Sequence, residues 1–362
     1  MTDQHPTVPT WTAEPPPPPT RRRLLGPGLV AALIAVVVLF GGVGLFAARQ
    51  AASTADGAGS PEAAAAGLLT ALGEQDLDRA AGYLAAEEAL LLDTYRERVT
   101  ALLAARMTGP SVQPLSGLQL TARDVRFQRV TGLGGVDVGV VELVGGTVGG
   151  RDPRGAKLEL PAAELNRRLA EQSKGAIKAL RAVAVRGDDD RWRVSLLATA
   201  AEQGRLAAGA AEPDWDRLAG AAPPAAPGAA SPEAAVDDLV AAAETGDPQA
   251  ALERLSPAER RVLAAYQPLL AHQGAMPGAG TVRIEGLQTR TEQVTDDVAK
   301  VHATAGRLAG SLGGSEARTL DEAVAKGEAP YVVTIRQDGT WYPSLVFTVT
   351  DWMLTRAERE RP

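Results

Sequence analysis

The stretches DDRWRVSLLATA (189–200) and DGTWYPSLVFTV (338–349) share one pattern, although they lie 149 positions apart. Each begins with Asp, has Trp three residues later, Ser-Leu three residues after the Trp, and Thr three residues after that Leu. Spaced matches of this kind are not a product of composition. They indicate that the chain contains the same unit twice.

The repeat extends back through both units. Residues 60–64 (SPEAA) match residues 231–235 at an offset of 171 positions. Equivalent pairs at this offset are Glu88 with Glu259 and Tyr95 with Tyr266. The offset falls to 149 at the two Trp residues, so the first copy holds extra residues, which we place within 145–180. Two copies at this long period predict tandem domains rather than a solenoid. We expect them at 60–203 and 231–355, with the second able to fold alone as 231–362.

Each copy starts with helix signals. Ser231 is a candidate N-cap before Pro232, and Asp247-Pro248 repeats this arrangement for a second, short helix. The segment 256–259 (SPAE) has the spacing of a capping box and predicts a third helix. Its counterpart in the first copy is expected at about 86–106, where apolar residues recur at helical spacing.

The second half of each copy alternates between apolar and polar residues, which is typical of strands. Asp338-Gly339 predicts a two-residue type I′ hairpin that pairs 331–337 with 340–350. Residues 181–186 and 191–199 are expected to form the equivalent hairpin. Extended as a strand, 341–349 places Trp341, Leu345 and Phe347 on one apolar face. Helices followed by antiparallel strands predict an α+β fold.

The stretch AAAETGDPQAALERLSP (241–257) and the Asp-Gly-x-Trp hairpin resemble the NTF2-like superfamily. The resemblance covers roughly 60–200 and 231–355. It implies a curved sheet that wraps a helix layer into a cone. One membrane span followed by such domains is also similar to actinobacterial envelope proteins of accessory role. Many superfamily members have no catalytic activity, so this fold by itself implies no reaction.

The N-terminus predicts a membrane anchor. Residues 1–23 form a Pro-rich tail that we expect to be disordered and cytoplasmic. Residues 24–48 are uncharged, and at ~1.5 Å per residue they are long enough to cross a hydrocarbon core of roughly 30 Å. The arginines 21–23 precede this transmembrane helix, so the domains behind it should lie outside the cytoplasm. A cleaved signal peptide is the alternative, but its apolar region would be shorter. Residues 49–59 are expected to be a spacer.

Two further segments lie outside the two predicted domains. The Ala-, Pro- and Gly-rich interval 204–230 reads as a linker. Trp215 is unusual in such a segment and is expected to dock on the first domain. Residues 356–362 are predicted to be a charged tail.

Composition and motifs exclude several function classes. The chain has no cysteine, which excludes thiol catalysis and zinc–thiolate sites. The net charge of −7 does not favour nucleic-acid binding. We find no phosphate-binding loop, serine-hydrolase motif or metalloprotease motif, so we predict no enzyme activity, no cofactor and no metal site. The acidic run 188–190 is interpreted as a solvated turn, and His272 and His302 as surface or loop residues.

Tyr95, Tyr266 and Tyr342 are the candidate binding residues, because aromatic side chains at a cone mouth or on a curved sheet can contact a ligand or partner. Packing of Tyr95 and Tyr266 against a sheet is the favoured alternative. Two functional hypotheses remain. The first is a membrane-anchored, extracytoplasmic envelope protein with a structural, accessory or partner-binding role. The second is a cone in one copy that binds or transforms a small apolar ligand.

Overall fold

The computed structural model describes residues 57–74, 76–104, 119–151, 157–220, 228–272, 283–309, 324 and 329–359. The tail 1–23, the expected transmembrane helix at 24–48 and most of the spacer 49–59 lie outside these residues. Within the ranges that are described, no helix combines the length and the hydropathy that crossing a bilayer requires.

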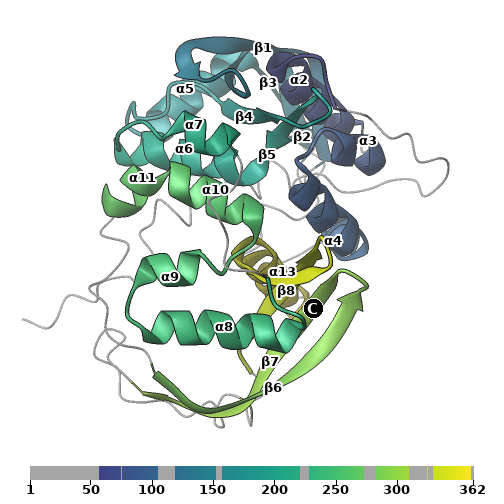
Figure 1. The fold of residues 1–362 in the computed structure, drawn as a ribbon. Coiled ribbons are helices and arrows are strands. Elements are labelled where there is room, and N and C mark those ends of the chain that lie inside the picture. The colour runs from purple at the N-terminus through teal and green to yellow at the C-terminus, as the bar shows by residue number, and fades with distance from the viewer. Residues whose placement is uncertain are drawn as a thin grey trace, which may run out of the picture.

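The chain forms helices and antiparallel strands in a similar order in both copies, which confirms the α+β class (Figure 1). The elements of the first copy are α2 (Pro61–Gly73), α3 (Leu77–Gly82), α4 (Ala86–Ala104), β1 (Gln119–Gly134), β2 (Val138–Arg151), β3 (Lys157–Pro161), α5 (Ala162–Gln172), β4 (Arg181–Arg186), β5 (Trp192–Ser195), α6 (Leu196–Ala208) and α7 (Trp215–Ala219). Those of the second copy are α8 (Pro232–Glu244), α9 (Pro248–Leu252), α10 (Pro257–Ala265), α11 (Gln267–His272), β6 (Arg283–Thr295), β7 (Val298–Ala309), β8 (Tyr331–Gln337), β9 (Thr340–Ser344) and α13 (Leu345–Arg359).

The helix starts follow the capping signals of the sequence. Ser231, Asp247 and Ser256 each accept a hydrogen bond from a backbone N–H in the first turn of α8, α9 and α10, at 3.2, 2.9 and 3.3 Å. A side chain that accepts such a bond pairs one of the free N–H groups at the helix start. The third helix of the first copy, expected at about 86–106, is α4.

Two antiparallel sheets follow the helices. The first has the strand order β1-β2-β4-β5, with β3 beside β2, and the second has the order β6-β7-β8-β9. Gln337 pairs with Thr340 at the tip of the last hairpin. Asp338 and Gly339 between them have φ angles of 50° and 81°, which confirms the type I′ turn.

The strands β5 and β9 are shorter than the sequence pattern predicted. The predicted strands 191–199 and 340–350 stop at Ser195 and Ser344, and a helix follows each of them. The Ser344 hydroxyl accepts a hydrogen bond from the Phe347 N–H at 3.2 Å and so caps α13. The expected common face of Trp341, Leu345 and Phe347 was therefore wrong: Leu345 is 44% exposed, whereas Phe347 is fully buried.

Helices cover both faces of each sheet. In the first copy, α2 packs on the face that presents Val141 and Ala184, and α6 packs on the face that presents Val140 and Val183. In the second copy, α8 and α13 take the equivalent positions on the two faces. Each sheet is thus the middle layer between two helical layers.

The third helix of each copy packs against the other copy. Tyr95 of α4 lies in one hydrophobic cluster with Val333, Ile335 and Phe347 of the second copy, and its ring centroid is 6.0 Å from that of Phe347. Tyr266 lies between α10 and α11. Together with neighbouring residues of both helices, it belongs to the hydrophobic cluster formed by β2, β4 and α6 of the first copy. In Figure 1, α10 and α11 lie beside α6 and α7, away from β6 and β7 of their own copy.

This reciprocal exchange joins the two repeats into one body. Tyr95 and Tyr266 occupy equivalent positions in the repeat, and each completes the core of the copy to which it does not belong. The ranges 60–203 and 231–355 therefore describe two sequence repeats with shared cores. The expectation that 231–362 folds alone is revised accordingly, because the core of that segment contains Tyr95.

The expected linker and C-terminal tail are partly helical. Helix α6 extends to Ala208 and α7 begins at Trp215, both inside the interval 204–230. As expected, Trp215 docks on the first copy, where its ring meets that of Tyr266 edge-on at 6.2 Å. Helix α13 continues into the predicted tail 356–362 as far as Arg359, and its Glu358 accepts a hydrogen bond from Arg98 at 2.9 Å. The interval 204–230 and the predicted tail 356–362 thus both contain helical residues.

Candidate functional site

The structure places two of the three candidate tyrosines in the hydrophobic core. Tyr95 and Tyr266 are 1% and 2% exposed, so neither can line the mouth of a pocket. Burial and the nearby Asp351 carboxylate raise the pKa of Tyr95, and burial and Glu202 do the same for the pKa of Tyr266. Asp351 and Glu202 are themselves equivalent positions of the repeat. The favoured alternative, packing of Tyr95 and Tyr266 against a sheet, is confirmed. The sheet in question belongs in each case to the other copy.

Tyr342 is half-buried in β9 and is the only one of the three candidates that reaches the surface. Its hydroxyl accepts a hydrogen bond from the Thr340 hydroxyl at 3.0 Å. The Arg260 guanidinium lies over its ring, 5.7 Å from the centroid. The ring therefore already has a cationic neighbour from α10, and a partner could reach only its outer edge.

The hollow in the described interior of the first copy is too small for a ligand. A hollow of about 30 Å³ lies between α2 and the sheet, bordered by Leu68, Phe127, Leu180 and Val194. This is about the space that one water molecule takes in the liquid, whereas ligand pockets measure roughly 300–1,000 Å³. The space between helix and sheet is filled by side chains.

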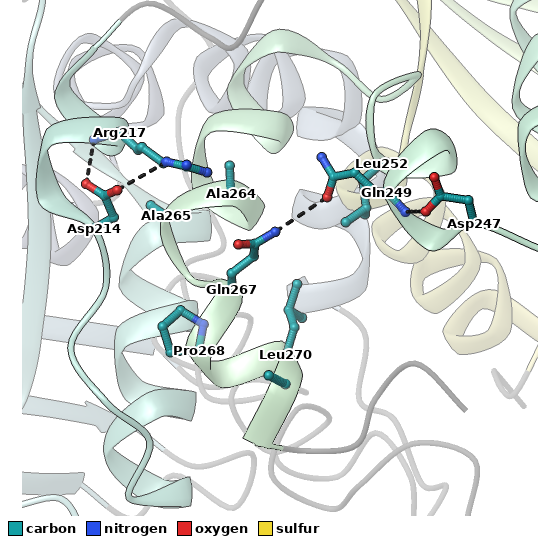
Figure 2. A pocket seen from close by; sticks show the side chains of 11 residues that line it. Asp214, Arg217, Asp247, Gln249, Leu252, Ala264, Ala265, Gln267, Pro268 and Leu270 are labelled. Carbon is teal, nitrogen blue, oxygen red and sulfur yellow. Dashed lines mark hydrogen bonds and ion pairs between the residues drawn. The ribbon is translucent and has the colours of Figure 1, made fainter. Parts of the chain in front are cut away.

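A groove of about 700 Å³ lies between the two copies (Figure 2). One wall comes from α7 of the first copy, and the others come from α9, α10 and α11 of the second. The groove exists because α10 and α11 cross to the first copy while α9 stays with the second. Its lining residues are Asp214, Arg217, Asp247, Gln249, Leu252, Ala264, Ala265, Gln267, Pro268, Leu270 and Ala271.

Small and apolar residues form much of the groove, and a few polar groups point toward one another across it. The Gln267 side-chain amide donates to the Gln249 side-chain oxygen at 3.5 Å, which joins α11 to α9. Arg217 pairs with Asp214 at 3.1 Å on the opposite side (Figure 2). Asp214 and Asp247 also accept hydrogen bonds from helix N–H groups, so both carboxylates have a structural role.

The described lining of the groove includes two carboxylates but no Ser, Thr, Cys, His, Lys or Tyr, so it does not pair a hydroxyl, thiol or amine nucleophile with a base. Across the part of the chain that the structure describes, no group of three or more His, Cys, Asp or Glu residues could hold a metal ion. The acidic turn at 188–190 is engaged in ion pairs, since Asp189 contacts Arg193 at 2.6 Å and Asp190 contacts Arg186 at 3.1 Å.

Three buried carboxylates at the junction of the copies were missed at the level of sequence. Glu87 and Glu88 begin α4, Glu259 lies in the first turn of α10, and they are 7%, 5% and 1% exposed. Burial and the charge of Glu259 raise the pKa of Glu87 to about 8, and burial raises the pKa of Glu259 to about 7. Burial also raises the pKa of Glu88. The match of Glu88 with Glu259 in the repeat was the signal that could have found two of them; Glu87 is matched by Ala258 and left no such signal.

A fourth buried acid, Asp351, ties α4 to the second copy. Its carboxylate contacts the Arg98 guanidinium, the Lys300 ammonium at 3.0 Å and the Tyr331 hydroxyl at 2.7 Å. Burial acts to raise the pKa of Asp351, but the hydrogen bond from Tyr331 and the charges of Lys300 and Arg98 outweigh it and hold this pKa below its ordinary value. His302 stands beside this network, 3.1 Å from Glu292. The network is fully paired and strengthens the exchange of α4.

No protein-family model matches this sequence, and no curated protein shows significant similarity to it.

Proposed function

We propose that the protein is a membrane-anchored, extracytoplasmic binding protein of the cell envelope, without catalytic activity, whose groove between the copies receives a segment of a partner protein. The groove carries this proposal. It is open, it measures about 700 Å³, and it is lined by small apolar residues with amide and charged groups at its sides. Such a surface can bury the side chains of an extended segment and hydrogen-bond its backbone.

The anchor and the family resemblance form part of the same proposal. Residues 24–48 insert into the bilayer and leave both copies outside the cytoplasm, as the uncharged run and the arginines before it favour. Each copy is an NTF2-like unit in which short helices precede a curved antiparallel sheet. The order of helices and strands within each copy supports this assignment.

The second candidate, a cone that holds a small apolar ligand, has less support. The hollow of the first copy has room for about one water molecule. Its two polar lining residues, Arg181 and Thr199, are engaged with Glu142 and Glu202 and with the Val183 N–H. The groove is more than twenty times larger.

Photo-crosslinking in intact cells tests the binding groove. Gln267, which is exposed inside the groove, is replaced with a photoreactive phenylalanine analogue, and Gln172 at the end of α5 serves as the matched exposed control. A discrete adduct from position 267 is expected, together with its loss when Ala264→Trp fills the groove. Mass spectrometry of the adduct should identify one contiguous partner segment. The same adducts from both positions, or an adduct that persists in A264W, would contradict the proposed function.

A further inference from the structure

The exchanged helices α4 and α10 begin close to one another, and their first turns carry the three buried carboxylates. Glu87 spans the junction. Its Oε1 accepts a hydrogen bond from the Ser256 hydroxyl at 2.6 Å, and its Oε2 accepts one from the Gln337 side-chain amide at 3.1 Å. Both donors belong to the second copy, so Glu87 links the start of α4 to α10 and to β8.

Glu88 and Glu259 hold the same helix starts to their own copies. The Ser195 hydroxyl donates to Glu88 Oε1 at 2.9 Å, and the Ser344 hydroxyl donates to Glu259 Oε1 at 2.8 Å. Glu259 also accepts from the Val346 N–H at 2.7 Å. The two carboxylates thus perform the same task at equivalent positions, and the Ser256 hydroxyl lies between Glu259 and Glu87.

One carboxylate oxygen in this cluster has no partner. Among the described residues, Glu88 Oε2 is fully buried and accepts no hydrogen bond of ordinary geometry, and the backbone near Leu197 compensates its charge only in part, since burial still raises the pKa of Glu88. A buried ionised carboxylate without a donor is costly, whereas a protonated carboxyl group removes that cost. This position therefore points to a proton as the species that the cluster holds.

The nearest cations are directed to other groups. Arg260 lowers the cost of charge on Glu87 only from a distance, because its Nη1 donates to the Glu253 carbonyl oxygen at 3.0 Å and its guanidinium lies over the Tyr342 ring. Arg261 acts on Glu88 in the same long-range way. The remaining groups that face the cluster are neutral donors from β5, β8, β9 and α10 and from the first turns of α6 and α13. No direct ion pair thus compensates the three acids among the described residues.

We propose that Glu87, Glu88 and Glu259 form a proton-dependent clasp between the two copies, closed while the cluster holds its proton and loosened when the proton is lost. Loss of the proton places like charges side by side at the start of both exchanged helices. Their repulsion acts on the contact between Glu87 and Ser256, and so on the seating of α4 against the second copy.

The direction of the pH effect follows from the raised pKa values. Burial and the charge of Glu259 raise the pKa of Glu87 to about 8 in the folded protein, above the ordinary value of 4.5. The folded state therefore binds more protons than the unfolded state between these values, and stability decreases as pH increases across this window. The stability that protonation of Glu87 contributes is complete below pH 4.5 and is lost once pH exceeds about 8. For each group that titrates, the unfolding constant should rise up to about tenfold per pH unit.

The test uses the full-length chain and compares Glu87→Gln with Glu97→Gln, an exposed glutamate on the same helix. Denaturant unfolding is measured at pH 6, 7.5 and 9. The parent and E97Q should lose stability as pH increases, whereas E87Q should lose markedly less. Because the chain has no cysteine, Gln172→Cys and Asp296→Cys provide one spin label on each copy. The distance distribution between them should broaden at pH 9 in the parent and stay narrow in E87Q.

Two results would overturn the clasp. One is an equal pH dependence of unfolding in the parent and in E87Q. The other comes from infrared difference spectra of the parent protein, and it applies even if E87Q does not fold. If the proposal is right, these spectra show the loss of a protonated carboxyl band between pH 6 and pH 9. A flat spectrum in that region would mean that the buried acids are ionised throughout. Neither result bears on the groove, whose crosslinking test is independent.

Discussion

Tyr95→Ala should destabilise the second copy, although Tyr95 belongs to the first. The ring is 1% exposed and packs against Val333, Ile335 and Phe347. Truncation of a buried aromatic residue to Ala costs about 3–5 kcal/mol, because both the burial of the ring and the packing around it are lost. The cavity would open between α4, β8 and α13, and the site has little freedom to collapse because the sheet holds one of its walls.

Tyr95→Phe is the matched control. Among the described residues the Tyr95 hydroxyl has no hydrogen-bond partner, so its removal should cost less than about 1 kcal/mol. A large loss for Ala together with a small loss for Phe would assign the stabilisation to the ring.

Hydrogen exchange read by mass spectrometry locates the damage. In Tyr95→Ala, backbone protection should fall most in β8 and α13 of the second copy, and less in α2 of the first. Denaturant unfolding of the full-length chain supplies the total cost. A loss of protection confined to the first copy, or a cost near zero, would refute the exchange of helices.

Three further outcomes are expected. Trp341→Ala should cost about 3–5 kcal/mol because the ring is buried under α8. Tyr342→Ala should cost at most about 2 kcal/mol because its ring is only half-buried. Denaturant unfolding that gives the reverse order of costs would contradict this assignment. Asp351→Asn should cost about 2–4 kcal/mol at neutral pH, since the part-buried Lys300 ammonium would lose its carboxylate partner while Arg98 keeps its ion pair with Glu358. A thermal shift no larger than that of a surface variant would argue against this. The fragment 231–362 should show no cooperative transition alone but should gain one when residues 57–220 are supplied, and independent cooperative unfolding would show that α4 is dispensable.

Local features of the fold were readable from residues close together in the chain. Asp338-Gly339 predicted a type I′ turn because few residues adopt positive φ twice in succession, and both angles are positive. Ser231, Asp247 and Ser256 predicted helix starts because their side chains pair with N–H groups only a few residues away. The repeat itself was visible in the spacing of Trp and Ser-Leu.

Features that depend on distant contacts were not readable. The alternation in 341–349 continues past Ser344, and the strand ends there because Ser344 caps the next helix and Glu259, far away in the sequence, accepts the Val346 N–H. The residues around Ser344 do not reveal that Glu259 will contact this segment. The same reason explains why α6 and α13 were not expected.

The sequence by itself determined that the chain holds two copies of one α+β unit and where most of their elements begin, because caps and turns are decided by residues within a few positions. Only the tertiary structure decided which sheet each third helix covers. The apolar face that contains Tyr95 or Tyr266 requires burial, but either copy offers a suitable surface, and its pattern does not distinguish between them. Complementary packing and the contacts of Arg98 with Asp351 and Glu87 with Ser256 select the exchange, and the groove exists as its consequence.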